Sequence, residues 1–395
     1  MASSHSCEFF SDKEAESLTS LYNEGGLAAV IPVIKDKLHN LENETLNIAV
    51  TGCTGSGKSA FINALRGLRR NDEGAAPVGV VEKTMEAKAY KHPNLPGVNL
   101  WDLPGTGSPT FQAKDYLKKV DLNKYDFFVI MAAKRFTEND ANLAVEIEKM
   151  GKQFYFIRNQ IDNDIRSYEL EGIEYNREEV LQTIRNDCIA NLEQIGIQEP
   201  CVFLLSSYYL NEYDFTAFTQ TIEAELPEKK KHVFWLSLPS VTLQVIEKKK
   251  QILKKRIWMI AAAAGGVGAI PVPGLSIACD IAILVAELLH CREFLGLDPQ
   301  SLQRLALNVG KPLEVLTAEV QNPFVFDITP QSVTKLLTSS IFGVLMIADD
   351  ALLLIPIIGC ILGGITSFGT TYMMLSNLLD QFVESTQRVV KKALE

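Results

Sequence analysis

The sequence predicts an α/β domain, with a mixed, mostly parallel sheet covered by helices on both faces, together with an all-α domain. Between residues 44 and 226, short apolar strands alternate with helical segments, which is typical of α/β domains. Segments 1–43 and 227–395 instead have helical periodicity almost throughout. We expect the N-terminal helices, which surround a break at Gly25 and Gly26, to pack on something later in the chain, because short helices are marginal alone.

The composition is that of a folded chain with a net negative charge. Of its 395 residues, 47% are hydrophobic and 22% are charged, and the formal net charge is −10. This charge argues against a nucleic-acid binder, whose affinity would come from Lys and Arg side chains that neutralise phosphates. The seven cysteines have no metal-ligand spacing and are typical of reduced thiols in a cytosolic protein. The N-terminus shows no secretory signal, and Ala2 does not fit the N-myristoylation pattern.

The stretch LNIAVTGCTGSGKS, residues 46–59, predicts a buried strand that runs into a phosphate-binding loop. Glycines let backbone N–H groups surround a phosphate, Lys58 reaches its β and γ oxygens, and Ser59 offers a hydroxyl to Mg²⁺. The following helix points its positive end at the anion. An incidental Gly-rich turn is disfavoured, because a strand precedes the loop and a helix follows it. The predicted nucleotide contacts are Gly52, Thr54, Gly55, Ser56, Gly57, Lys58, Ser59 and Ala60.

Two further segments have the spacing of the loops that respond to a γ-phosphate. The polar stretch NDEGAAPVGVVEKT, residues 71–84, ends at Thr84, a candidate second Mg²⁺ ligand. The strand at 98–101 leads into Asp102-Leu103-Pro104-Gly105, where Asp102 can hold Mg²⁺ through water and the Gly105 N–H can bond a γ-phosphate. The next residue is Thr106, where many small GTPases carry a glutamine that orients the attacking water.

The strand at 154–158 is followed by Asn159-Gln160-Ile161-Asp162, a candidate guanine-reading segment. A carboxylate such as Asp162 accepts from guanine N1–H and the exocyclic amine, and Asn159 bonds the other base edge, a pattern that adenine cannot match. Gln160 stands where N-K-x-D motifs have a lysine. After the strand at 201–205, Ser206 and Ser207 lie where backbone amides and a hydroxyl can close over the base. The alternative is a plain polar loop after a strand.

The helical segment contains basic clusters and two long apolar tracts. Lys229 to Lys231 and Lys248 to Lys250 favour a solvated helix face over a site for acidic lipid headgroups. The apolar tracts, residues 257–289 and 336–379, favour buried helices of a bundle, because the carboxylates Asp280, Asp349 and Asp350 lie inside them. A helical hairpin that inserts into lipid on cue is the alternative.

With these motifs in place, the chain resembles the immunity-related GTPases, an interferon-inducible family, over nearly its whole length. The resemblance is carried by GCTGSGKS at 52–59, GAAPVGVVEKT at 74–84, WDLPGTG at 101–107, LLSSYYLNEYDF at 204–215 and IPVPGLSIACDIAILV at 270–285. Lys58 makes the chain similar to the hydrolysing subclass. The resemblance implies a Ras-like G domain over 44–226 and a helical domain built from the N-terminal segment 1–43 and the C-terminal helices of 227–395.

The resemblance also implies what such a protein does. Family members bind GTP and GDP with Mg²⁺, oligomerise through their nucleotide faces when loaded with GTP, and gather on vacuoles that enclose intracellular pathogens. We therefore expect a cytoplasmic protein that pairs with itself and with other family members and contacts endomembranes peripherally through the helical domain. Glu82 falls where family members carry a switch glutamate implicated in hydrolysis. We expect it to position or activate water when two G domains face each other.

The predicted function is that of a dynamin-like, oligomerising GTPase that cleaves GTP to GDP and phosphate. Lys58, Glu82 and Thr84 are the predicted catalytic residues, and Ser59, Thr84 and Asp102 the predicted metal site. The alternative is a GTP-gated binding module with negligible hydrolysis, which Gln160 and Thr106 would permit. An ATPase or small-molecule kinase is disfavoured by Asn159 and Asp162.

Overall fold

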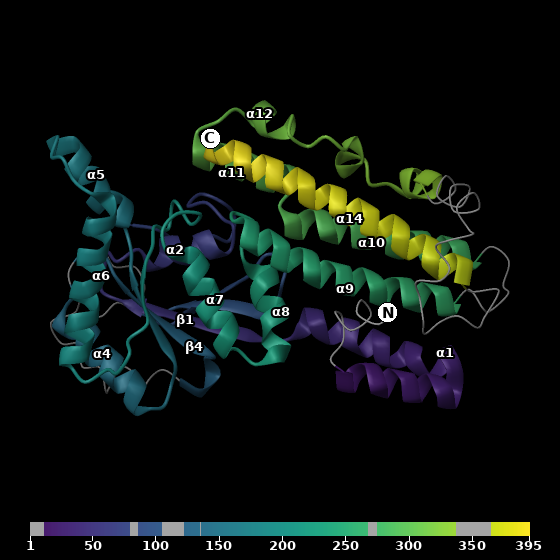
Figure 1. Ribbon diagram of the computed structural model, residues 1–395, viewed down its shortest axis with the longest axis horizontal. Helices are drawn as coiled ribbons and strands as arrows, with labels where there is room; N and C mark the ends of the chain where they lie inside the picture. The colour runs from purple at the N-terminus through teal and green to yellow at the C-terminus, as the bar shows by residue number, and fades with distance from the viewer. Residues whose placement is uncertain (1–11, 80–85, 105–121, 135, 268–274, 337–364) are drawn as a thin grey trace, which may run out of the picture. The chain divides into compact units, whose positions relative to one another are not determined.

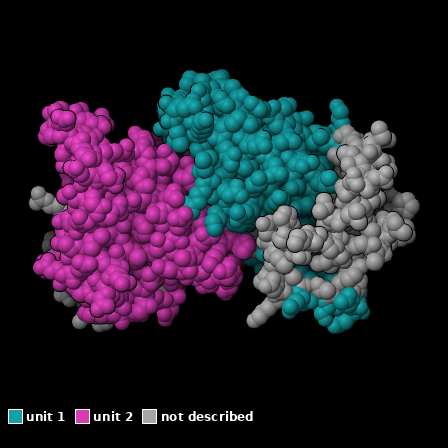
Figure 2. All heavy atoms as spheres, in the orientation of Figure 1, with its two compact units in different colours: residues 1–42, 243–395 teal, residues 43–242 magenta. Residues whose placement is uncertain are grey.

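The computed structural model describes residues 12–79, 86–104, 122–134, 136–267, 275–336 and 365–395, and its elements are drawn in Figure 1. The chain divides into two compact units (Figure 2). Residues 43–242 form the α/β unit, and residues 1–42 with 243–395 form the helical unit.

Within the described residues, the α/β unit is built on one six-stranded sheet in the order β2-β3-β1-β4-β5-β6. The strands are β1 (Leu46–Gly52), β2 (Lys88–Lys91), β3 (Val98–Asp102), β4 (Phe127–Ala132), β5 (Phe154–Arg158) and β6 (Val202–Leu204). All neighbours are parallel except β2, which pairs antiparallel with β3. This is the mixed, mostly parallel sheet that the sequence predicts, and the carboxyl ends of β1, β3, β4 and β5 meet at one edge.

Helices cover both faces of this sheet (Figure 1). They are α2 (Lys58–Leu65), η1 (Leu122–Lys124), α4 (Glu138–Lys149), α5 (Ile161–Glu171), α6 (Arg177–Gln194), α7 (Phe215–Glu225) and α8 (Glu228–Ser237). The sequence-based division at residue 227 would put α8 with the helical domain, whereas its contacts place it in the α/β unit. Lys229 pairs with Glu44 at 3.2 Å and Lys230 with Asp126 at 2.6 Å, so two of the predicted basic residues hold α8 against this unit.

Alternate residues of the buried strands fill two cores. On one face, Phe128, Ile130 and Phe156 pack among apolar residues of α4 and α6. On the other face, Phe218 of α7 makes aromatic contacts with Tyr155, with ring centroids 6.1 Å apart. The period-two alternation of a strand sends consecutive side chains to opposite faces, so strands that are buried on both faces are apolar throughout. Strand β4, FFVIMA, is buried at every position.

The helical unit contains long helices that run through apolar sequence. Its elements are α1 (Asp12–Asn43), α9 (Leu243–Val267), α10 (Leu275–Leu295), α11 (Pro299–Val309), α12 (Leu313–Thr317), η2 (Pro323–Phe326) and α14 (Ile365–Leu394). Val30 and Ile34 of α1 pack with Met259 and Ala261 of α9, which supplies the apolar partner that the N-terminal helix needs. The predicted break at Gly25 and Gly26 lies inside the bounds of α1.

Charged groups are buried between the helices of this unit. Arg256 Nε donates to both carboxylate oxygens of Glu287, at 2.9 and 2.7 Å. Lys249 Nζ donates to the Phe294 carbonyl at 2.6 Å, near the end of α10, and Lys249 is buried. The expectation that Lys248 to Lys250 form a solvated face is therefore wrong for Lys249, because α9 turns this residue toward α10.

No helix in the described part of the chain combines the length and the apolar composition needed to cross a membrane. In the second predicted apolar tract, Asp349 and Asp350 lie outside the described residues.

Candidate functional site

The phosphate-binding loop leaves the carboxyl end of β1, the strand that lies between β3 and β4. Gly52 has φ 131° and Gly57 has φ 91°, in the region that favours glycine. A Cβ on Gly52 would lie 2.0 Å from the Met131 carbonyl oxygen, and one on Gly57 would lie 2.4 Å from Asn159 Nδ2. Close approach of two neighbouring segments therefore requires both glycines, in addition to any contact with a ligand.

Lys58, the first residue of α2, places its ammonium group inside this loop. Its Nζ donates to the carbonyls of Gly52 and Cys53, each at 3.0 Å, and the residue is 8% exposed. The Cys53 carbonyl also accepts from the Ser56 N–H at 3.2 Å. These carbonyls orient the lysine without neutralising its charge, so the ammonium group is available to stabilise an anion in the loop.

Ser59 and Asp102 meet where β1 and β3 end. Ser59 Oγ donates to Asp102 Oδ2 at 2.9 Å, and Asp102 is 1% exposed. Strand register brings them together, because Val50 of β1 pairs with Asp102 of β3. Mg²⁺ takes oxygen ligands and usually keeps several waters, so a hydroxyl such as that of Ser59 could bind it directly beside a carboxylate that holds it through water. The two side chains therefore fit the predicted magnesium site.

The predicted base-reading segment holds the phosphate-binding loop directly. Asn159 Nδ2 donates to the Ser56 carbonyl and Gln160 Nε2 to the Gly55 carbonyl, each at 2.9 Å. Two successive side-chain amides thus bond two successive carbonyls, an arrangement that we call the amide clip. Gln160 adopts φ 63° at the start of α5, which turns its side chain toward the loop.

The side-chain oxygen of Asn159 accepts hydrogen bonds from the loop that follows β6. Asn159 Oδ1 accepts from Ser207 N at 3.2 Å and from Ser207 Oγ at 3.1 Å. Ser206 Oγ accepts from the N–H groups of Tyr208 and Tyr209, each at 3.3 Å. Ser206 therefore shapes its own loop, whereas Ser207 connects that loop to the base-reading segment.

Asp162 lies in the first turn of α5. Its Oδ1 is buried and has no hydrogen-bond partner within the described residues. A buried carboxylate oxygen without a donor is costly, so its place beside the clip fits a ligand that brings donors of its own.

The remaining predicted residues fall into two groups. Thr54 and Gly55 are exposed at the tip of the loop, and Ala60 is half-buried in α2. Glu82, Thr84 and Gly105 lie outside the described residues, as does Thr106.

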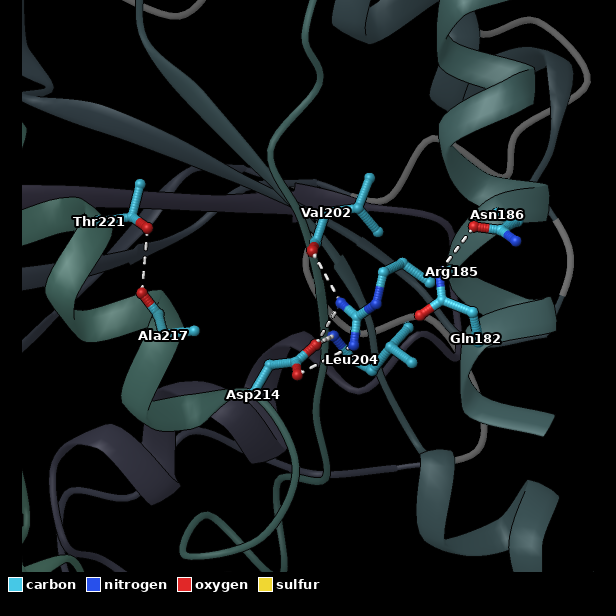
Figure 3. A network of polar contacts seen from close by, with 8 residues as sticks. All are labelled: Gln182, Arg185, Asn186, Val202, Leu204, Asp214, Ala217 and Thr221. Atoms are coloured by element: carbon cyan, nitrogen blue, oxygen red, sulfur yellow. Dashed lines mark hydrogen bonds and ion pairs between the residues drawn. The ribbon is translucent and has the colours of Figure 1, made fainter. Parts of the chain in front are cut away.

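A side-chain network that no sequence motif indicates fixes the loop carrying Ser206 and Ser207 (Figure 3). Arg185 of α6 donates two bonds to Asp214, at 2.7 and 3.1 Å, and Asp214 Oδ2 accepts from the Leu204 N–H at 2.7 Å. The Asp214 N–H donates back to the Leu204 carbonyl at 3.1 Å. Both ends of the loop, at β6 and at α7, are thereby tied to each other and to α6.

A second contact that the motifs do not indicate joins the phosphate-binding loop to α4. Cys53 Sγ donates to Asp140 Oδ1 at 3.4 Å and lies 3.2 Å from Thr137 Oγ1. Burial raises the pKa of the Asp140 carboxyl, while hydrogen bonds from Thr137 and Cys53 and the charge of Lys58 act in the opposite direction.

The chain is similar to known proteins over most of its length. The family model for the interferon-inducible GTPases (IIGP) matches residues 11–393. The chain is 39% identical to interferon-inducible GTPase 5 of Rattus norvegicus, over 97% of this chain and 83% of that protein. It is 43% identical to interferon-inducible GTPase 1 of Mus musculus, over 78% of this chain and 75% of that protein. The solved G domain of FeoB from Methanococcus jannaschii is 21% identical, with 46% of this chain and 97% of that one covered and a TM-score of 0.27.

Proposed function

The chain belongs to the interferon-inducible GTPase family, and from that premise we propose that it binds GTP and GDP in the loop of residues 52–59 and reads guanine with Asn159 and Asp162. The chain is a GTPase of an immunity-related family. The observation that carries the assignment of the site is the amide clip, which joins the phosphate-binding loop to the base-reading segment. A nucleotide has its base and phosphates at opposite ends, so its site needs both segments held at a fixed separation.

Guanine selectivity would come from donor and acceptor matching. The buried Asp162 Oδ1 has no donor among the described residues, and guanine offers N1–H and an exocyclic amine. Adenine offers an acceptor at N1, which would leave the carboxylate unsatisfied and repelled. A ligand without such donors should bind much more weakly, because its binding leaves a buried polar group unpaired.

The phosphate end would be stabilised by charge placement. Lys58 holds its ammonium group in the loop, and the N-terminus of α2 directs backbone N–H groups to the same place. Mg²⁺, when bound with the nucleotide, would neutralise charge on the phosphate oxygens. Ser59 and Asp102 are the described residues that would hold it, and Thr84 remains a predicted third ligand.

We propose that hydrolysis is completed by a second copy of the chain through the nucleotide face. Among the described residues of the site, Asp102 accepts from Ser59, and Asp162 is the residue proposed to read the base, so we assign the orientation of water to neither. The sequence has Thr106 at the position of the water-orienting glutamine, and Glu82 is the proposed substitute. A group supplied or ordered by a facing G domain would make turnover depend on assembly.

We further propose that the protein is cytoplasmic and acts at the membranes of pathogen-containing vacuoles, in contact with them through the helical unit. Family membership supports this proposal. Sedimentation of the full chain with neutral and anionic vesicles tests it, since peripheral contact through basic side chains should require anionic lipid and weaken with salt.

The experiment that tests the enzymatic proposal is GTP turnover measured against protein concentration, from below one to tens of micromolar, with ATP as the control nucleotide. We expect the rate per molecule to rise with concentration for GTP and to stay near zero for ATP. Glu82→Ala should remove the rise while leaving GTP bound. A flat, near-zero rate with GTP bound would favour the GTP-gated binding module, and a Glu82→Ala protein as active as the native one would rule out the role of Glu82.

A further inference from the structure

The buried carboxylate of Asp140 is used neither by the sheet nor by any predicted nucleotide contact. Asp140 is 0% exposed, and within the described residues no cation lies at ion-pair distance from it. It belongs to the capping box at the start of α4, where Thr137 Oγ1 accepts from the Asp140 N–H at 3.3 Å and Asp140 Oδ2 accepts from the Thr137 N–H at 3.1 Å. Such boxes work at the protein surface, so capping alone does not account for this burial.

The two carboxylate oxygens have different partners. Oδ2 receives the Thr137 N–H and the Thr137 hydroxyl, the latter at 2.7 Å. Oδ1 receives the thiol of Cys53 at 3.4 Å, a distance suited to a sulfur donor. One oxygen therefore caps the helix, and the other holds the phosphate-binding loop.

Cys53 is the residue through which this contact reaches the site. Its carbonyl accepts from Lys58 Nζ at 3.0 Å and from the Ser56 N–H at 3.2 Å, so the same residue orients the lysine and closes the loop's turn. Its side chain fixes the residue from the side of α4, whereas the amide clip holds the loop at Gly55 and Ser56 from the side of α5.

We propose that Asp140 is a positioning residue for nucleotide binding, which holds Cys53, and with it the carbonyl that Lys58 contacts, in the conformation that encloses the phosphates. This inference rests on the proposed binding of GTP and GDP at residues 52–59. Because a rigid loop loses less conformational freedom when it binds, the contact should act on affinity for both nucleotides.

The test is the equilibrium dissociation constant for GDP with Mg²⁺, measured by calorimetry on the full chain. Cys53→Ala removes the contact but keeps the bonds between Thr137 and Asp140, and we expect it to weaken GDP binding about tenfold, because the loop must then be ordered when the nucleotide binds. Cys53→Ser keeps a donor and should restore most of the affinity. The matched control is Cys201→Ala, which removes another half-buried thiol, directly before β6, and should bind GDP as the native chain does.

The double variant with Cys53→Ala and Asp140→Asn separates a role in positioning the loop from a role in the stability of the whole chain. Asp140→Asn should weaken GDP binding in the native background, and the loss in the double variant should be smaller than the sum of the two single losses, because both changes act on the bond between Cys53 Sγ and Asp140 Oδ1. The thermal midpoint of the nucleotide-free Cys53→Ala protein should stay close to the native value. Additive losses, or native affinity in Cys53→Ala, would overturn the proposal.

Lys58→Ala distinguishes the failure of this inference from the failure of the proposed site. If Lys58→Ala loses GDP binding while Cys53→Ala binds normally, only the positioning role is wrong. If Lys58→Ala itself binds GDP normally, the loop is not the nucleotide site, and the proposed function fails with the inference.

Discussion

The side-chain amide of Gln160 donates to the carbonyl of Gly55 at 2.9 Å, so a residue of the base-reading segment supports the phosphate-binding loop. The sequence departs here from the lysine of N-K-x-D motifs. A lysine could stack its stem on the base, whereas the glutamine amide is committed to the loop. The consequence is that residue 160 acts on the phosphates through the loop backbone more than on the base.

Replacement of Gln160 by Ala should therefore weaken GTP and GDP alike, by about fivefold to tenfold, the effect of one neutral hydrogen bond. The preference for GTP over ITP, which lacks the exocyclic amine, should not change, because Gln160 does not read that group. Competition binding with the two nucleotides measures both quantities. A changed GTP to ITP ratio would place Gln160 on the base instead.

Asp162 Oδ1 has no hydrogen-bond partner within the described residues, and we predict that replacing Asp162 changes the base specificity of the site. Asp162→Asn replaces one acceptor with a donor, which suits the C2 carbonyl of xanthine and repels the guanine amine. We expect GTP affinity to fall by at least about a hundredfold and XTP affinity to rise. Equilibrium binding of both nucleotides checks this, with Glu171→Gln as the control at an exposed position of the same helix. Unchanged GTP affinity in Asp162→Asn would contradict the guanine assignment.

The pair between Arg256 and Glu287 should dominate charge effects on the stability of the helical unit. Glu287→Ala would leave the mostly buried guanidinium group of Arg256 without this carboxylate, which costs about 3–5 kcal/mol of unfolding free energy. The control Glu384→Ala removes an exposed pair with Arg388, whose atoms are 3.9 Å apart, and should cost less than about 1 kcal/mol. Urea denaturation of the full chain gives both values, and equal losses would contradict the prediction.

We predict that the contribution of Lys249 to the free energy of unfolding rises with pH. Burial lowers the pKa of Lys249 from 10.5 to about 7 in the folded chain. Between these values the unfolded state binds more protons than the folded state, so the unfolding free energy attributable to this residue increases with pH and is lost as pH falls toward 7. Lys249→Met removes the titration. The native unfolding free energy minus that of Lys249→Met should therefore grow from pH 7 to pH 9, and a constant difference would contradict a lowered pKa.

Much of the α/β unit could be predicted because its signals are local. A strand of contiguous apolar residues followed by a Gly-rich loop is written within residues 46–59, and the strands before Asp102 and Asn159 are equally continuous. The antiparallel strand β2 has no such signal, since KAYK is short and mostly polar and is a strand only because it pairs with β3. The placement of α8 likewise follows from contacts that are distant in sequence, such as that of Lys230 with Asp126.

The amino-acid sequence specifies the chemical groups that this protein offers to a guanine nucleotide: the glycines and Lys58 of the loop, the carboxylate of Asp102, and the Asn159 and Asp162 pair. These groups can be recognised from the identity of the residues and their short spacing along the sequence. The contacts that those groups make depend on the folded chain. The contacts of Asn159 with Ser56, of Cys53 with Asp140 and of Lys249 with Phe294 join residues 103, 87 and 45 positions apart. Such contacts form only when sheet register and helix packing bring distant segments together, and no local spacing encodes them.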